Sequence, residues 1–173
     1  MAWRLRRAGA GDSAALSLIA SAAFLDTYVS VLDGGDLVEH CLKHNTTDAF
    51  ATWAGDPTTV VTLAEHEPAH APLGYTVLTA PDFPDGTQAG DIELRRIYTL
   101  SQTHGSGLGA ALMAQAIDDA RALGARRILL GVWDENRRAR AFYERQGFVV
   151  VGARQFQVGA AIHDDPVYAR VIA

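Results

Sequence analysis

Three glycines at alternate positions, Gly105, Gly107 and Gly109, stand between a β-rich run and a long helical run. Because glycine has no Cβ, the backbone N–H groups of such a loop can approach an anion closely, and the positive end of the next helix adds attraction. A turn that binds nothing needs fewer glycines. The loop therefore predicts a phosphate-binding site in a chain that combines strands with helices.

The length of 173 residues suits one domain, and 49% hydrophobic with 20% charged residues is a globular composition. The single cysteine, Cys41, cannot form an intramolecular disulfide, which fits a reducing compartment. The Arg-Leu-Arg-Arg stretch at 4–7, followed by the apolar run 14–24, imitates a signal peptide, but that run has helical spacing after Asp12. No segment reaches the length of a membrane span, so we expect a cytoplasmic protein.

Charge is divided unevenly along the chain. The net charge is −5, which argues against a general nucleic-acid binder. Acids dominate from Ala8 to Glu93, where Lys43 is the only basic residue, whereas arginines dominate from Leu94 to Arg154. This division suggests that one half faces a cationic ligand and the other an anionic one, with solvated surface charge as the alternative.

The hydrophobic patterns predict one α/β (α+β) domain, with a mixed, mostly antiparallel sheet of about six to seven strands and helices on both faces. A Pro- and Gly-bearing loop is expected over 81–90. The strands are expected over 3–8, 58–63, 74–79, 91–99, 126–132, 148–158 and 165–171. The helices are expected from an Asp12 cap to before Asp33 and over 36–44, 47–53, 107–123 and 136–146.

Two motifs resemble one known family. His104-Gly-Ser-Gly-Leu-Gly109 resembles the Arg/Gln-x-x-Gly-x-Gly/Ala coenzyme A loop of the GNAT N-acetyltransferase superfamily, and the stretch 133–148, with its Phe-Tyr-x-x-x-Gly-Phe pattern, resembles the motif that follows it. More loosely, Phe24-Leu-Asp-Thr-Tyr28 is similar to the bacterial branch that includes polyamine acetyltransferases. The resemblance implies a single GNAT domain over 1–173. Its expected parts are an acceptor-side region 1–92, the acetyl-CoA motifs 93–150 and the terminal strands 151–173.

The resemblance implies direct acetyl transfer from acetyl-CoA to a primary amine of a small acceptor. If the acidic residues between 8 and 93 recognise this acceptor, we expect it to be cationic, such as a polyamine. The amine must lose a proton, and the departing thiolate must be protonated or stabilised. By resemblance, Tyr143 donates a proton or a hydrogen bond to the CoA sulfur, and Glu93 is the general base, acting through water. The alternatives are that Tyr143 is a core aromatic beside Phe142 and Phe148, and that Glu93 forms an ion pair with an arginine.

Further residues are expected to bind acetyl-CoA. His104 stands where the family usually has Arg or Gln, so we expect weaker or differently arranged phosphate contact there. Asn136 is expected both to cap a helix and to contact the pantetheine arm. The strand residues act through their backbone, aided by a splay between the central strands. The complete predicted set is Ile97, Tyr98, Thr99, His104, Gly105, Ser106, Gly107, Leu108, Gly109, Ala110 and Asn136.

Two other functions are open. The chain could be a CoA-binding regulatory module without turnover, or a dinucleotide enzyme, because Gly105-x-Gly107-x-x-Ala110 and Asp134 fit that fingerprint. Too little chain follows for repeated βα units, which places the dinucleotide enzyme last. The expected partner is a small-molecule amine, with no nucleic acid and no membrane, and a homodimer is compatible with the sequence.

Two histidine pairs imitate metal sites. His66-Glu67-Pro68-Ala69-His70 fits a zinc-protease pattern, but Pro68 prevents the helix that would bring both histidines to one face. His40 and His44 stand four apart on a predicted helix, without further ligands to complete a site. We expect a polar helix face there and no metal.

Overall fold

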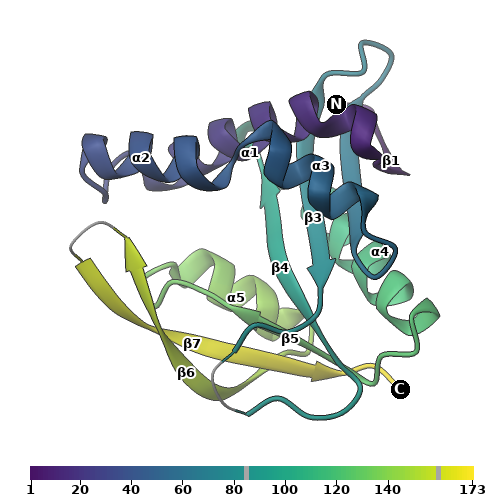
Figure 1. Cartoon of the computed structure of the whole chain (residues 1–173), viewed down its shortest axis with the longest axis vertical. Helices are drawn as coiled ribbons and strands as arrows, with labels where there is room; N and C mark the ends of the chain where they lie inside the picture. Colours follow the sequence, from purple (N-terminus) through teal and green to yellow (C-terminus); the bar gives the residue numbers. More distant parts are fainter. Residues whose placement is uncertain (84–85, 159–160) are drawn as a thin grey trace. The chain divides into compact units, whose positions relative to one another are not determined.

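The computed structural model describes residues 1–83, 86–158 and 161–173, so residues 84 and 85 of the loop expected over 81–90 lie outside the described part. The strands are β1 (Trp3–Arg7), β2 (Val60–His66), β3 (Pro72–Thr79), β4 (Asp91–Thr99), β5 (Arg127–Gly131), β6 (Val149–Val158) and β7 (Ala161–Val171). The helices are α1 (Ser13–Tyr28), α2 (Gly34–His44), α3 (Thr47–Gly55), α4 (Leu108–Ala122) and α5 (Arg137–Arg145), with 3₁₀ turns η1 (Ala10–Asp12) and η2 (Ser101–Thr103). The strand order is β1-β2-β3-β4-β5-β7-β6 (Figure 1), which confirms the predicted mixed, mostly antiparallel sheet.

The chain divides into two compact units. The first comprises Met1–Leu78 and Arg96–Ala116, and the second comprises Thr79–Arg95 and Ile117–Ala173. Strand β4 and helix α4 each contribute residues to both units. Within the described ranges, no helix combines the length and the apolar character that a membrane crossing requires.

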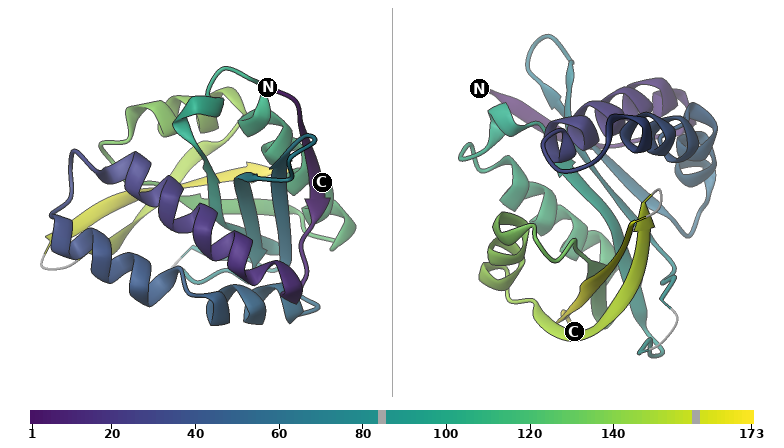
Figure 2. Two further views of the ribbon diagram at one scale, coloured as in Figure 1. Left: turned by 90° about the horizontal axis from the view of Figure 1, so that it is seen from above. Right: turned by 90° about the vertical axis from the view of Figure 1, so that its left-hand side faces the viewer.

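The first unit is built on the antiparallel strands β1, β2 and β3. Buried side chains of α1 and α3, among them Ile19 and Phe50, pack against Leu63 and Tyr75 on one face of these strands. The start of α4 packs against the other face, where Ala64 and Leu73 meet Leu108 and Leu112. Because neighbouring strand residues point to opposite faces, both faces of this unit carry helices, as predicted. Figure 2 shows α1, α2 and α3 as a group of neighbouring helices from two sides.

The second unit holds the C-terminal strands and α5. Strand β4 runs parallel to β5 over Asp91–Glu93 and Arg127–Leu129, and β5 pairs antiparallel with β7. Strands β6 and β7 form a long antiparallel hairpin whose register shifts between Val150 and Gly152. Strand β4 pairs with β5 over three residues of each strand, whereas β5 continues to Gly131.

Several element boundaries differ from the sequence expectation for local reasons. Asp12 stands at the N-cap of α1, but its carboxylate binds Arg6 and the Gly9 N–H instead of capping the helix. Helix α2 begins at Gly34 because Asp33 caps it, accepting from the Gly35 N–H at 2.7 Å. Strand β2 begins two residues later than expected because Thr58 is held in a turn by the Asp56 carboxylate.

Candidate active site

The glycine loop is an open, exposed backbone segment in the first unit. Gly105 and Gly107 have φ values of 80° and 85°, in the left-handed region that favours glycine. A Cβ built on either glycine would meet no atom within 4 Å, so the space over the loop is open. The preceding turns are ordered by hydrogen bonds from the His104 N–H to the Ser101 carbonyl (2.9 Å) and from the Ser106 N–H to the Thr103 carbonyl (3.1 Å).

The loop leads directly into the N-terminus of α4. Leu108 is fully buried and anchors the helix, while Gly109 and Ala110 complete its first turn. The N–H groups of a first helical turn have no carbonyl partner within the helix, and they carry the positive end of its dipole. No acidic side chain stands in this turn. Open space, exposed glycines and a positive helix end together fit a phosphate-bearing ligand such as the pyrophosphate of acetyl-CoA.

The end of β4 is held firmly beside the loop. Ile97 packs into the cluster formed by Leu108 and Leu112 of α4, while the Tyr98 ring stacks on Tyr75 with centroids 6.0 Å apart. A Cβ on Gly74 would lie 2.6 Å from the Tyr98 carbonyl oxygen, so only glycine permits this approach of β3. The structure therefore brings Ile97, Tyr98 and the loop together in one unit.

Glu93 lies in the second unit and is 2% exposed. Its Oε2 accepts from Arg95 Nη2 at 3.1 Å and from the Asp82 N–H at 3.0 Å. Its Oε1 lies 3.6 Å from Arg154 Nη1. The sequence left an ion pair with one arginine as the alternative to a general-base role for Glu93. The structure contains this ion pair, with two arginines, Arg95 and Arg154.

Arg154 is a partner of Glu93 that sequence reasoning missed. Its guanidinium lies over the Phe83 ring at 4.9 Å from the centroid and directly on Gly131, where an added Cβ would be 2.6 Å from the guanidinium carbon. Glycine at position 131 therefore makes room for the arginine. No sequence motif marked this residue, because Arg154 on β6 and Glu93 on β4 are distant in the chain.

Tyr143 is buried within an aromatic group at the end of α5. Its ring centroid lies 5.5 Å from Phe142, 6.1 Å from Phe148 and 6.2 Å from Tyr168. The core role considered as an alternative is therefore present. Glycine at 147, with φ 81°, ends the helix, and the Phe148 N–H donates to the Tyr143 carbonyl at 3.0 Å.

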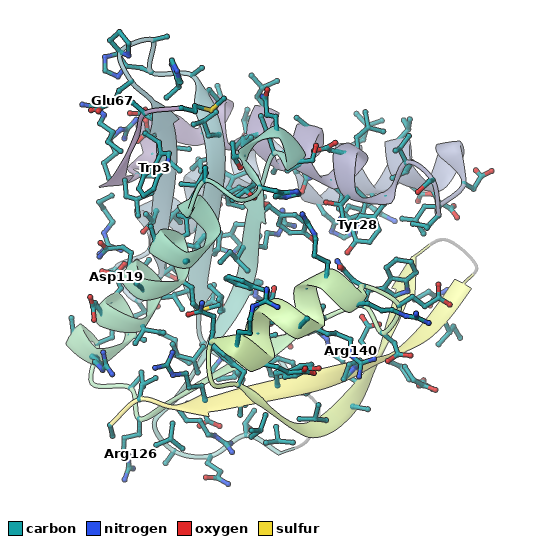
Figure 3. All side chains as sticks on the ribbon, turned by 180° about the vertical axis from the view of Figure 1, so that it is seen from behind. Trp3, Tyr28, Glu67, Asp119, Arg126 and Arg140 are labelled. Carbon is teal, nitrogen blue, oxygen red and sulfur yellow. The ribbon has the colours of Figure 1, made fainter. Side chains whose placement is uncertain are left out.

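The hydroxyl of Tyr168 joins two charged side chains of α5. It accepts from Arg140 Nε at 3.2 Å and donates to Glu144 Oε1 at 3.0 Å, and Figure 3 labels Arg140 on this helix. Arg140 also pairs with Asp134 at 2.7 Å, so the carboxylate considered as a ribose ligand is bound to an arginine. Asn136 caps α5 as predicted, because its Oδ1 accepts from the Ala139 N–H at 3.0 Å.

Arg96 of β4 ties the corner between α2 and α3 to the sheet of the first unit. It donates to the Asn45 side chain at 2.6 Å and to the His44 carbonyl at 3.1 Å. Its guanidinium lies 4.9 Å from the centroid of the Trp53 ring. Beside it, complete burial raises the pKa of Tyr75.

The expectation of a polar helix face at His40 is wrong. The His40 ring stacks on Phe24 with centroids 4.0 Å apart and planes within 5°, because α1 and α2 are neighbours. Burial, helped by His44 and Arg96, lowers the pKa of His40 to about 4. His66 and His70 flank the β2–β3 turn. Among the described residues, no group of three or more His, Cys, Asp or Glu side chains could hold a metal ion.

The predicted site residues thus form two groups. The loop and the end of β4 lie in the first unit, and Glu93, Asn136 and Tyr143 lie in the second. The first group presents exposed glycine backbone at the start of α4, and the second holds a buried carboxylate, a buried tyrosine and a helix cap.

Comparison with known proteins adds independent information. Residues 26–148 match the acetyltransferase (GNAT) family model. The chain is 36% identical over 121 residues to uncharacterized N-acetyltransferases of Mycobacterium bovis and Mycobacterium tuberculosis, covering 70% of this chain and 72% of each relative. A mycothiol acetyltransferase of Beutenbergia cavernae is 53% identical over 64 residues, covering 35% of this chain and 22% of that protein.

Solved structures show the same fold. The PaiA N-acetyltransferase of Thermoplasma acidophilum, in complex with coenzyme A, aligns with a TM-score of 0.79 at 17% identity, covering 99% of both chains. An N-acetyltransferase of Staphylococcus aureus aligns with a TM-score of 0.75 at 19% identity and covers 100% of both chains. The chain belongs to the GNAT family of acetyltransferases and is an N-acetyltransferase that uses acetyl-CoA.

Proposed function

We propose that the protein transfers the acetyl group of acetyl-CoA directly to a primary amine of a small, cationic acceptor. The open glycine loop at the N-terminus of α4 is the observation that carries the donor side of this proposal. Residues 93–150 supply the acetyl-CoA motifs, residues 1–92 the acceptor side and residues 151–173 the terminal strands. The acetyl thioester supplies the electrophilic carbonyl when it is bound.

Backbone donors hold the donor in this proposal. The exposed backbone from Gly105 to Ala110 receives the pyrophosphate, through N–H groups other than those of Ser106 and Leu108, which already donate within the loop. His104 and Ser106 offer side-chain contacts at the edge of the loop. The backbone of Ile97, Tyr98 and Thr99 aligns the pantetheine arm as a further strand would, and Asn136 contacts the same arm.

Two side chains serve the proton transfers. Tyr143 gives a proton or hydrogen bond to the departing sulfur, supported by the aromatic packing that fixes its ring. Glu93 removes a proton from the attacking amine through water. We assign this role to its Oε1, because Oε2 already accepts two hydrogen bonds, whereas Arg154 is 3.6 Å from Oε1. The β4–β5 pairing ends at Glu93, which supports the expected splay beside it.

A matched pair of variants separates catalysis by Glu93 from its ion pairing. Asp91 lies two residues away on the same strand and forms a similar buried ion pair, with Arg127 at 2.7 Å. Both Glu93→Gln and Asp91→Asn should lower the melting temperature, since each breaks a buried pair. Only Glu93→Gln should lower kcat. Equal loss of kcat in both variants would leave Glu93 with a structural role alone.

The acceptor class rests on charge. Exposed Asp48 of α3 and half-buried Asp36 of α2 contribute acids to the first unit, where Lys43, the only basic residue between 8 and 78, pairs with Glu39 at 3.3 Å. Several other acids are neutralised, since Asp12 pairs with Arg6, and Glu65 with Arg4 and Arg6. The field that would attract a polyamine therefore comes from the helices. The net charge of −5 supports a small molecule over a nucleic acid as acceptor.

Release of free thiol from acetyl-CoA tests the whole proposal. The acceptors compared are spermidine, which is polycationic, tyramine, whose amine is its only charged group, and glutamate, which is acidic. The mass of the acetylated product is the second measurement. Spermidine should give the highest kcat/KM, and its KM should rise with ionic strength through about 0.1 M, where the screening length falls to about 10 Å. A preference for glutamate would overturn the cationic acceptor. Coenzyme A binding without thiol release on any amine would favour the regulatory module.

A further inference from the structure

A carboxylate at the end of α1 holds the segment that leads into the glycine loop. Asp26 Oδ2 accepts from the Ser101 N–H at 2.6 Å, and Asp26 Oδ1 accepts from the Ser101 hydroxyl at 3.0 Å. The two residues are 75 positions apart, and both belong to the first unit. No sequence motif pairs them, and neither residue is part of the predicted site.

The contact satisfies a helix end that lacks a cap of its own. Ser101 is the first residue of η2, and Leu100 at the N-cap makes no side-chain hydrogen bond. A leucine side chain has no acceptor, so the N–H of the exposed Ser101 is left to water or to an oxygen from another segment. Asp26 supplies that oxygen from α1. Asp26 stands in the last turn of α1, where the negative end of the helix dipole disfavours a carboxylate. The hydrogen bond from the first N–H of η2 offsets this unfavourable interaction.

Backbone hydrogen bonds connect Ser101 to the glycine loop, residue by residue. The Thr103 N–H donates to the Leu100 carbonyl at 2.9 Å, and the His104 N–H to the Ser101 carbonyl at 2.9 Å. The Ser106 N–H then donates to the Thr103 carbonyl at 3.1 Å. Glycine-rich backbone loses much conformational freedom when it is ordered, so an anchor before the loop lowers the cost of ligand binding.

The same end of α1 contacts α2. The Phe24 ring stacks on His40 and lies 4.6 Å from the Tyr28 ring, and Figure 3 labels Tyr28 at this end of the helix. We propose that Asp26 is a positioning residue that pre-orders the acetyl-CoA loop and couples it to the end of α1. Energetic coupling is reciprocal, so a ligand that orders the loop also stabilises residues 24–31. The inference rests on the proposed binding of acetyl-CoA by the loop.

The sign of the electrostatic effect makes the test specific. Asp26→Asn removes a negative charge near a loop that binds an anion, and this alone would tighten coenzyme A binding. Loss of positioning would weaken it. Asp48→Asn removes the same charge from an exposed site on α3 and is the matched control. Ser101→Ala removes the hydroxyl contact and keeps the N–H contact.

Calorimetry with coenzyme A should show the Kd of Asp26→Asn raised about tenfold, which is about 1.4 kcal/mol, and that of Ser101→Ala raised about threefold. Asp48→Asn should bind like the wild type. The KM for acetyl-CoA should rise in parallel, with kcat at saturation within about twofold of the wild type, because Asp26 touches no reacting atom. Hydrogen exchange over residues 24–31 should slow on coenzyme A addition in the wild type and not in Asp26→Asn.

An unchanged or tighter Kd in Asp26→Asn would overturn the proposal, as would an equal weakening in Asp48→Asn. Protection of residues 24–31 that persists in Asp26→Asn would overturn the coupling. If the wild type itself does not bind coenzyme A, the proposed function fails together with this inference. If it binds and only the Asp26 effect is missing, the proposed function stands and the positioning role falls.

Discussion

Replacing Gly107 by alanine separates the backbone cost of the loop from its binding role. Gly107 has φ 85°, and a Cβ there would meet no atom within 4 Å. The substitution therefore creates no clash inside the protein. Its cost to folding is the left-handed backbone conformation, about 1–2 kcal/mol for a residue with a Cβ. For a chain of this size that corresponds to a melting temperature lower by about 2–8 °C.

Gly124 is the matched control. It follows α4, has φ 77°, and a Cβ there would also meet nothing within 4 Å. Gly124→Ala should therefore lower the melting temperature by a similar amount, and it should leave coenzyme A binding unchanged. The two variants share the backbone strain and differ only in whether the glycine belongs to the predicted loop.

Coenzyme A binding should distinguish the two variants. In Gly107→Ala the new methyl group occupies the open space over the loop and keeps the phosphate away from the N–H groups. Losing one charge-assisted hydrogen bond, worth about 1.5–3 kcal/mol, raises the Kd about 10- to 150-fold. Isothermal titration calorimetry measures this directly. Wild-type affinity in Gly107→Ala would refute the assignment of the loop, and an equal loss in Gly124→Ala would attribute it to global destabilisation.

Three further perturbations test other parts of the molecule. Tyr143→Phe keeps the aromatic packing and removes the hydroxyl. Steady-state kinetics should therefore show kcat lower by about a hundredfold, with little change in the Kd of acetyl-CoA. Unchanged turnover would leave Tyr143 with its role in the core alone. Gly74→Ala places a Cβ 2.6 Å from the Tyr98 carbonyl oxygen and should cost about 1–3 kcal/mol in chemical denaturation, whereas Gly55→Ala, with open surroundings, should cost little. Folding lowers the pKa of His40 to about 4, so between about pH 6.5 and 4 the unfolded chain binds a proton at His40 that the folded chain does not. The free energy of unfolding should therefore fall as the pH falls through that window. Denaturation of His40→Gln across this range should show a flatter pH dependence, and an identical slope would contradict the assignment.

Local features were predictable because they depend on few neighbouring residues. The strand over 91–99, the helix cap at Asn136 and the helix-ending glycine at 147 all match the structure. Hydrophobic periodicity and backbone preferences act over one or two turns, so they are visible in the order of the residues. The family motif around the glycine loop is equally local, and the match over residues 26–148 confirms the family.

Partners of charged groups were not predictable in the same way. Asp12 was expected to cap α1, yet its carboxylate binds Arg6, because a bidentate arginine contact is stronger than a cap to a neutral N–H. The same Arg6 contact lowers the pKa of Asp12. His40 was expected on a polar face and instead stacks on Phe24, because the packing of α1 on α2 decides what each helix face meets.

The order of the helices and strands, the glycine loop, the cap of α5 and the family were predictable from the order of the residues, because each depends on residues close together in the chain. The contact of Arg154 with Glu93, the space that Gly131 leaves for Arg154, and the hydrogen bonds from Ser101 to Asp26 depend on tertiary packing. The partners in each of these contacts lie far apart in the chain. Periodicity says which face a side chain occupies, and only the packing of distant segments says which opposite charge or free N–H it meets there.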